Sequence, residues 1–209
     1  MATGRSGIVL AGGYSTRFGD REKALAAVAG EPMLARVVSR LGRVVERVVV
    51  NCRTDQREAF ERALADCEVP VGFALDSVPD EGPLAGLETA LGRVETEYVA
   101  VAACDMPAID PAFVEFLFAR ARGHDGAVPE DREGTLQPTQ AVYRVDAMRT
   151  ATVGELDAGR RSLRGALDRL DAVVVPTLEV AERTDWRTFR DLNTQRALAA
   201  FESEEDGRP

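Results

Sequence analysis

The stretch "GIVLAGGYSTRFGDREKAL", residues 7–25, starts as an apolar run, breaks at paired glycines and then presents Arg17 and Lys23. An apolar run that stops at glycines predicts a buried strand followed by a loop whose backbone can approach a ligand closely. The chain has 26 lysines and arginines together, and Lys23 is its only lysine. We therefore predict a functional role for Lys23, because this composition has shed lysine at every other position.

The composition limits the kind of protein. The 209 residues, 45% of them hydrophobic, suffice for one sizeable core, so we expect a single domain over residues 1–209, with disorder at 1–6 and about 202–209. The formal net charge of −9 argues against nucleic-acid partners and against anionic membranes, because both need basic surface. The sequence has no run of eighteen apolar residues, and we expect a cytoplasmic protein.

Two further features of the composition concern the environment of the chain. Cys52, Cys67 and Cys104 show no CxxC spacing, which predicts free thiols rather than a disulfide framework or a zinc site. The use of arginine in place of lysine in an acidic chain fits either a high-salt cytoplasm or a GC-rich genome. Neither origin bears on the chemistry of the protein.

Short β-branched runs alternate with longer amphipathic stretches along the chain. The predicted strands are 7–11, 47–51, 72–75, 98–103, 139–143 and 172–175. The spacing of apolar residues predicts helices within 31–43, 54–66, 82–94 and 111–122. This alternation predicts an α/β fold with a mostly parallel central sheet that is covered on both faces.

Polar residues stand at the ends of the predicted strands. Ligands of a parallel sheet bind beyond the carboxyl ends of its strands. Gly12 and Gly13 follow the first predicted strand, whereas Asn51, Asp76 and Asp105 end or follow the next three. These residues are therefore candidates for one ligand-binding site.

The glycine loop has features of a phosphate site. Exposed amides of paired glycines can hold phosphate or a base edge, and Arg17 and Lys23 would form a local basic site in an acidic chain. The loop matches neither the Walker pattern nor GxGxxG. Asp110, followed by Pro111, can cap the next helix, which leaves Asp105 free to bind Mg²⁺ beside phosphate oxygens.

The motifs together resemble the molybdenum cofactor guanylyltransferases of the MobA type, within the nucleotidyltransferase superfamily. "LAGGYSTRFGDREKAL" is similar to the signature of the superfamily, and further segments of the family are similar to "GPLAGLETAL", "ACDMP", "LQPTQAVYR" and "DLNTQRAL". The resemblance spans residues 7 to about 198. It implies a Rossmann-like, three-layer nucleotide-diphospho-sugar transferase fold and Mg²⁺-dependent transfer of GMP from GTP to the molybdopterin-bound molybdenum cofactor, with release of pyrophosphate.

The resemblance also assigns roles to residues. It implies nucleotide binding by Leu10, Ala11, Gly12, Gly13, Lys23, Asn51, Asp76 and Asp105. Asp105 matches the Mg²⁺ ligand as well, and with Arg17 and Lys23 it forms the expected catalytic set. Asp191, at a position where asparagine is frequent, and Asn193 match a polar pair expected to face the pterin substrate or to complete the metal shell. Transient contact with cofactor-handling proteins is a further implication.

Several alternatives remain open at this stage. A molybdenum cofactor cytidylyltransferase, a guanylyltransferase for a cobamide precursor and a nucleotide-binding carrier without turnover would share the same motifs. Arg160, Arg161 and Arg164 form a basic cluster that could hold an anionic acceptor or could be a solvated helix start. His124 is far from the predicted strand ends, so we do not expect it to act as a base. Gln137 stands where the family frequently has histidine.

Overall fold

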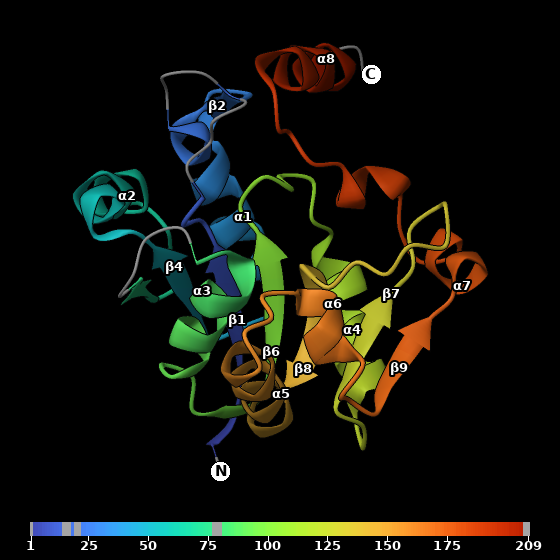
Figure 1. The fold of residues 1–209 in the computed structure, drawn as a ribbon. Coiled ribbons are helices and arrows are strands. Elements are labelled where there is room, and N and C mark those ends of the chain that lie inside the picture. Colours follow the sequence, from blue (N-terminus) through green and yellow to red (C-terminus); the bar gives the residue numbers. More distant parts are fainter. Residues whose placement is uncertain (1, 14–17, 19–21, 77–80, 207–209) are drawn as a thin grey trace.

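A seven-stranded sheet in the order β5-β4-β1-β6-β8-β7-β9 forms the centre of the protein (Figure 1). The computed structural model describes residues 2–13, 18, 22–76 and 81–206. The strands of this sheet are β1 (Ala2–Leu10), β4 (Arg47–Cys52), β5 (Val71–Leu75), β6 (Thr96–Ala103), β7 (Gly126–Pro129), β8 (Gln140–Arg144) and β9 (Ala172–Val175). Strands β5, β4, β1 and β6 are parallel, whereas β8 runs antiparallel to β6 and β7. The prediction of a mostly parallel sheet is confirmed.

Helices cover both faces of the sheet (Figure 1). The α-helices are α1 (Met33–Leu41), α2 (Arg57–Ala63), α3 (Pro83–Leu91), α4 (Pro111–Ala121), α5 (Val145–Asp157), α6 (Leu163–Leu167), α7 (Thr177–Ala181) and α8 (Gln195–Asp206). Shorter elements are the 3₁₀ helices η1 (Lys23–Leu25), η2 (Thr54–Gln56) and η3 (Trp186–Phe189), and the hairpin β2 (Ala27–Val28) and β3 (Glu31–Pro32). The four helices predicted from apolar spacing correspond to α1, α2, α3 and α4.

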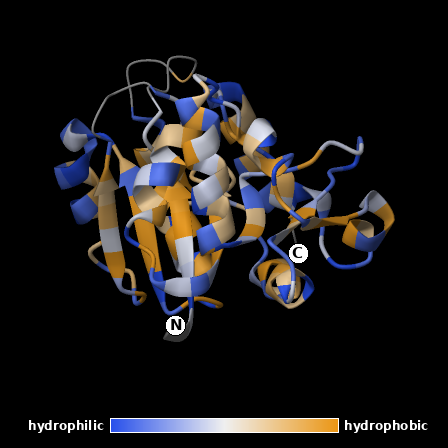
Figure 2. Cartoon of the chain, turned by 60° about the horizontal axis from the view of Figure 1, so that its bottom comes forward, coloured by the Kyte–Doolittle hydropathy of each residue, from blue (hydrophilic) through white to orange (hydrophobic). Residues whose placement is uncertain are grey.

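Side chains that alternate along the central strands divide the core into two halves. Val9, Val48 and Val50 pack with apolar side chains of α1, α2 and α4. Ile8 and Val49 pack with those of α3, α5 and α6. All five are fully buried, as expected for parallel strands covered on both faces. Figure 2 shows the central strands as mostly hydrophobic, beside helices in which hydrophilic and hydrophobic residues are mixed.

The amino-terminal end corrects one expectation. We expected disorder at residues 1–6, but residues 2–6 lie within β1, which pairs with β4 on one side and with β6 on the other. Ser6 is fully buried between these strands. The polar composition of this segment gave no sign of its place in the middle of the sheet.

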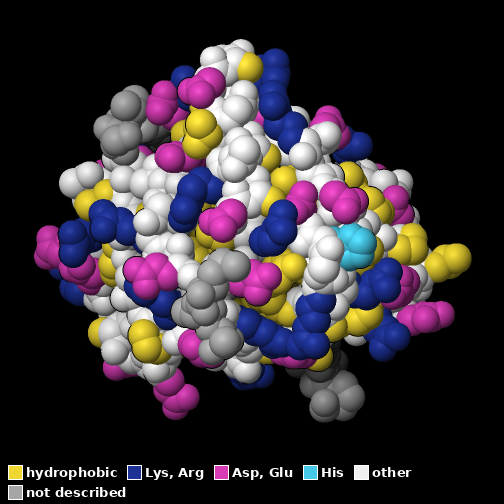
Figure 3. All heavy atoms as spheres, turned by 90° about the horizontal axis from the view of Figure 1, so that it is seen from below, with side chains coloured by type: hydrophobic (Ala, Val, Ile, Leu, Met, Phe, Trp, Pro, Cys, Tyr) yellow, Lys and Arg dark blue, Asp and Glu magenta, His cyan; other side chains and the backbone are white. Residues whose placement is uncertain are grey.

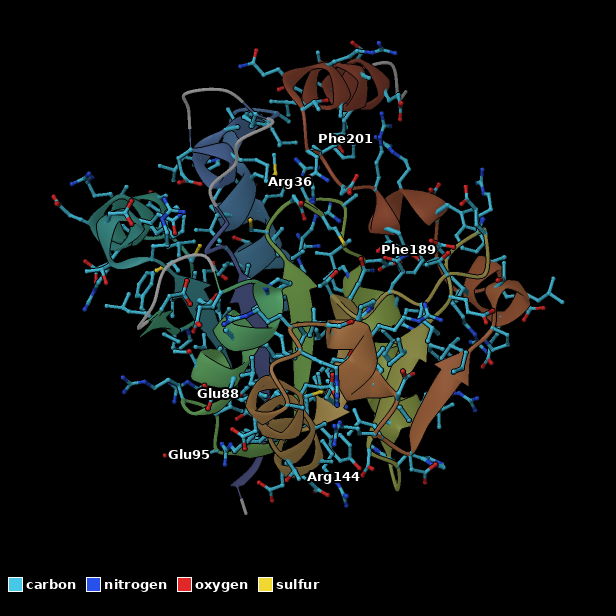
Figure 4. The ribbon with its side chains drawn as sticks, viewed as in Figure 1. Arg36, Glu88, Glu95, Arg144, Phe189 and Phe201 are labelled. Carbon is cyan, nitrogen blue, oxygen red and sulfur yellow. The ribbon has the colours of Figure 1, made fainter. Side chains whose placement is uncertain are left out.

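The carboxyl-terminal end corrects a second expectation. We expected disorder from about residue 202, but residues 202–206 lie in α8. Phe201 is fully buried with Met33 and Leu192, and Arg36 of α1 donates two 2.7 Å hydrogen bonds to the carboxylate of Glu205. Arg36 and Phe201 both lie between α1 and α8 in Figure 4. The acidic tail is held because its carboxylates meet arginines that are distant in the sequence.

One strand of the sheet was not predicted. Strand β7 has four residues, begins at the last glycine of the turn-like "GHDG" and carries only Ala127 and Val128 as aliphatic residues before its proline. Its glycine and its proline both count against a strand in a sequence pattern. In the structure it extends the sheet between β8 and β9.

Three observations concern the outside of the molecule. None of the helices in the described ranges is long and apolar enough to cross a membrane. Acidic and basic side chains are intermingled on the end of the molecule that Figure 3 shows. The single histidine, His124, is half exposed and lies near Asp171.

Candidate active site

A cavity of about 330 Å³ opens at the carboxyl ends of the parallel strands. Its wall contains every predicted nucleotide-binding residue: Leu10, Ala11, Gly12, Gly13, Lys23, Asn51, Asp76 and Asp105. The volume lies in the range of roughly 300–1,000 Å³ that is usual for small-molecule pockets. Parallel pairing of β5, β4, β1 and β6 explains this convergence, because their carboxyl ends meet at one edge of the sheet.

Asn51 and Asp76 form what we call the amide–carboxylate pair. Asn51 is the fifth residue of β4 and Asp76 directly follows β5. Asn51 Nδ2 donates to Asp76 Oδ1 at 2.7 Å and to the Ala74 carbonyl oxygen at 3.2 Å. The backbone amide of Asp76 donates to the carbonyl oxygen of Cys52 at 3.0 Å. The strand ladder thus continues beyond β5 and holds the two side chains together.

Two glycines make room for the amide–carboxylate pair. A methyl group on Gly12 would lie 2.5 Å from Asp76 Oδ2, and one on Gly86 would lie 2.2 Å from Asn51 Oδ1. Both distances are shorter than van der Waals contact, so any larger residue would displace the pair. The "GPLAG" segment therefore needs its second glycine for packing of α3 against β4.

The environment of Asp76 makes its charged form less favourable than that of an ordinary aspartate. Partial burial raises the pKa of Asp76, and the hydrogen bond from Asn51 and the charge of Arg53 oppose this rise without cancelling it. The hydrogen-bonding partner is a neutral amide rather than a cation. Asp76 is thus a carboxylate that a ligand with hydrogen-bond donors would stabilise in its charged form.

Lys23, Asp105, Asn193 and Asp191 form what we call the lysine cluster. Lys23 Nζ, in η1, donates to Asp105 Oδ2 and to Asn193 Oδ1, both at 2.8 Å. Asn193 Nδ2 in turn donates to Asp191 Oδ2 at 2.6 Å. Lys23 and Asp105 line the cavity, whereas Asp191 and Asn193 do not belong to its wall. The structure thus brings together residues from both ends of the chain.

The backbone fixes the segment that carries Asn193. The amide of Leu192 donates to the carbonyl oxygen of Asp105 at 2.9 Å, and the Leu192 side chain is buried beside Phe201. Gln195, at the start of α8, donates to the carbonyl oxygen of Phe18 at 3.2 Å. The docking of α8 therefore determines where Asn193 meets Lys23.

The first turn of α3 adds polar backbone groups to the wall. Gly82 precedes the helix with a φ of 85°, a left-handed conformation that favours glycine, and Pro83 begins the helix. Among the described residues, no side chain caps the start of this helix, whose residues Ala85 and Gly86 line the cavity. A helix amino terminus that opens into a cavity favours an electronegative group there.

The oxygen donors of the lysine cluster fit Mg²⁺. Among the residues that the structure describes, no group of three or more His, Cys, Asp or Glu is arranged around a common point. Mg²⁺ does not need such a group, because it takes one or two carboxylates and completes its shell with phosphate oxygens and water. The Asp105 carboxylate, with the amide oxygen of Asn193 nearby, offers this kind of donor set.

Other predicted residues lie away from the cavity or outside the description. Arg17 falls outside the described residues. Arg160 donates to both carboxylate oxygens of the buried Glu155, which agrees with a structural role. Hydrogen bonds from Arg160, and then from Arg169, lower the pKa of Glu155 to about 2. Gln137 donates to Asp131 at 2.7 Å and does not belong to the cavity wall.

The sequence did not single out several residues that shape the cavity. Glu22 and Glu81 line it, and Glu81 is paired with Arg161 at 2.9 Å. Arg53 and Gln56 lie behind the glycine loop and bind its carbonyl oxygens. Their position after a predicted strand end could have indicated a role, but arginine and glutamine are common surface residues. Cys104 is buried next to Asp105, and burial raises its pKa to about 12, which keeps it a neutral thiol.

Comparison with known proteins identifies the family. The model of the "MobA-like NTP transferase domain" matches residues 7–173. The chain belongs to this family. A MobA-like relative from Natronomonas pharaonis, named "Probable molybdenum cofactor guanylyltransferase", is 43% identical over 194 residues, which cover 93% of this chain and 95% of the relative. A relative of the same name from Haloferax mediterranei is 40% identical and covers 97% of this chain and 95% of its own length.

A solved structure agrees with this membership at the level of the fold. "Molybdopterin-guanine dinucleotide biosynthesis protein A" from Archaeoglobus fulgidus superposes with a TM-score of 0.78 at 24% identity, covering 97% of this chain and 100% of the other. The MobA-like chain is thus a nucleotidyltransferase with the α/β fold that the sequence predicted.

Proposed function

We propose that this MobA-like enzyme transfers GMP from GTP to the terminal phosphate of the molybdopterin-bound molybdenum cofactor and releases pyrophosphate. The observation that carries this proposal is that one cavity holds both the amide–carboxylate pair and the ion pair between Lys23 and the strand-end carboxylate of Asp105. The names of the two relatives described above support this choice of cofactor and base.

The amide–carboxylate pair is suited to guanine. The N1 and N2 groups of guanine are adjacent hydrogen-bond donors, and one carboxylate can accept from both. Asp76 has a neutral partner and a pKa that burial raises, so two hydrogen-bond donors from a base would stabilise its charged form. Adenine and cytosine present a different order of donors and acceptors and would leave this carboxylate unsatisfied.

The lysine cluster is suited to the phosphates. Among the described residues of the wall, Lys23 is the only basic side chain, and the acidic ones are Glu22, Asp76, Glu81 and Asp105. A triphosphate would meet net negative charge here without a cation. Mg²⁺ held by Asp105 would supply charge neutralisation. Lys23, released from Asp105 as phosphate oxygens arrive, would bind the α-phosphate and the departing pyrophosphate.

The reaction needs no acid or base from the protein. An oxygen of the acceptor phosphate attacks the α-phosphorus of GTP, a new P–O bond forms and the bond from the α-phosphorus to the bridging oxygen breaks. Pyrophosphate leaves with that electron pair. A phosphate is already a nucleophile at neutral pH, so positioning and charge neutralisation supply the catalysis.

An assay of pyrophosphate release tests this proposal. The purified protein is incubated with Mg²⁺, the molybdopterin-bound cofactor and GTP, CTP or ATP in turn. We expect release with GTP in clear preference to the other two, and none without the acceptor. Preference for CTP would favour a cytidylyltransferase, turnover only on a cobamide precursor would favour the other guanylyltransferase, and GTP binding without turnover on either acceptor would favour a carrier.

A further inference from the structure

A buried arginine lies directly behind the glycine loop. Arg53 follows β4 and is 7% exposed, yet it does not line the cavity. Its Nη1 donates to the carbonyl oxygen of Gly12 at 3.1 Å and to that of Gly13 at 2.9 Å. The rest of the guanidinium is held by Asp55, at 3.1 Å to both Nε and Nη2, and by Glu22 at 3.5 Å. The buried guanidinium of Arg53 thus contacts two carbonyl oxygens of the loop and two carboxylates.

These contacts fix the direction of a loop peptide. In a trans peptide the C=O and the next N–H point in opposite directions, and the described backbone contains no cis peptide. Because the carbonyl of Gly12 points to Arg53, the amide of Gly13 points away from it. Gly13 lines the cavity and Arg53 does not, so that amide faces the ligand side.

Because the loop consists of glycines, its conformation has to be fixed by other residues. Paired glycines let the backbone approach a ligand closely, but each can adopt many conformations, so the loop does not fix its own peptides. Gln56 extends the same support: its Nε2 donates to the carbonyl oxygen of Ala11 at 3.3 Å and to Glu22 Oε2 at 2.8 Å. The side-chain amide of Gln56 thus connects Ala11, at the start of the loop segment, with Glu22, which directly precedes Lys23.

We propose that Arg53 is a positioning residue that holds the Gly12–Gly13 backbone in the orientation that binds the nucleotide. This inference rests on the proposed function, because the ligand is the GTP assigned there. Arginine is required because its planar fork reaches two carbonyls and two carboxylates at once, whereas the ammonium group of lysine is a single point charge. The arginine acts through the loop and does not touch the substrate.

The test measures GTP affinity and thermal stability of Arg53→Lys separately. Calorimetric titration with GTP and Mg²⁺ is carried out well below the melting temperature, where the variant is folded. Loss of charge-assisted hydrogen bonds that hold the loop should raise the Kd for GTP at least about fivefold. The matched control is Arg57→Lys, the same change at an exposed arginine of α2 that pairs with Glu61. We expect no change in its Kd.

The outcomes separate this inference from the proposed function. If the wild-type chain shows no preference for GTP, the proposed function fails. If it binds GTP and Arg53→Lys binds with a Kd raised less than about fivefold, Arg53 has only a structural role and the inference is overturned, whatever the melting temperature. If Arg53→Lys does not fold, Arg53→Gln, which keeps a donor for the carbonyls, is measured by the same criterion.

Discussion

The amide–carboxylate pair and the lysine cluster share one cavity but are held in different ways. Asn51 and Asp76 come from adjacent strand ends and are fixed by the sheet ladder and by close packing against Gly12 and Gly86. The lysine cluster joins residues 82 and 170 positions apart in the sequence, and in it Lys23 forms an ion pair with Asp105 and a hydrogen bond with Asn193. The amide–carboxylate pair is therefore already arranged to select a base, whereas the lysine cluster has to exchange partners when phosphates and a cation arrive.

The comparison predicts that the largest effect comes from Lys23. In Lys23→Ala the phosphates lose a charge-assisted contact worth about 1.5–3 kcal/mol, which corresponds to a loss of about ten- to a hundredfold in kcat/KM. Steady-state kinetics of pyrophosphate release measures this loss. Arg62→Ala, at an exposed arginine of α2 paired with Glu58, is the control and should retain wild-type kinetics. Near-normal turnover of Lys23→Ala would remove Lys23 from the mechanism.

The next effect separates two aspartates of the same loop. Asp105→Asn keeps the shape but loses the charge that holds Mg²⁺, so we expect weak activity with a much weaker dependence on Mg²⁺ concentration. Asp110 caps α4, accepting from the amide of Ala112 at 2.9 Å. Asp110→Ala should lower stability by about 1 kcal/mol and leave the Mg²⁺ dependence unchanged. Titration of activity with Mg²⁺ and thermal melting of both variants check this contrast, and an Asp105→Asn enzyme with normal Mg²⁺ dependence would contradict it.

A smaller effect is expected for Asn193, the member of the lysine cluster that contacts Lys23 from outside the cavity wall. Asn193→Ala removes the neutral acceptor that orients Lys23, and because Asp105 remains as its partner we expect a loss of up to about tenfold in kcat/KM. Ser203→Ala, in the exposed part of α8, changes a bond within the helix only and should have no effect. Unchanged kinetics of Asn193→Ala, measured in the same assay, would show that Asp105 alone positions Lys23.

The smallest effect concerns pH and tests the amide–carboxylate pair. The pKa of Asp76 is raised by burial, so its charge is lost at a higher pH than for an ordinary aspartate as the solution is acidified. Since guanine would bind the charged form, GTP affinity should fall as the pH drops through this raised pKa. Calorimetric titrations across this pH range measure the decrease in GTP affinity. In Asp76→Asn, the decrease that is caused by protonation of Asp76 should be absent. An identical pH profile for the variant would exclude Asp76 as the titrating group.

The two regions also differ in how far the sequence predicted them. Asn51 and Asp76 could be placed together because parallel strands align their carboxyl ends, a rule that needs only the strand positions. The contact of Lys23 with Asn193 could not be derived in this way, since it depends on the docking of α8. The charged tail of that helix suggested disorder, and its ion pairs with Arg36, Arg187 and Arg190 have no local signal.

Support of the glycine loop was the other feature beyond sequence reasoning. Arg53 is one of many arginines, and nothing in its neighbours indicates burial or contact with Gly12 and Gly13. The strand β7 was missed for a related reason, because its sequence, GAVP, has only two aliphatic residues between a glycine and a proline. Local periodicity therefore predicted the central elements, and contacts across the chain determined the rest.

The central claim, that the two regions divide base selection from phosphate chemistry, is tested most directly by nucleotide selectivity. The ratio of kcat/KM for GTP to that for CTP and for ATP is measured in the wild-type enzyme, Asp76→Ala and Lys23→Ala. We predict that Asp76→Ala lowers this ratio by about tenfold or more, because the carboxylate that recognises guanine is gone. Lys23→Ala should slow all three nucleotides alike and preserve the ratio. A preserved ratio in Asp76→Ala, or a collapsed one in Lys23→Ala, would contradict the account.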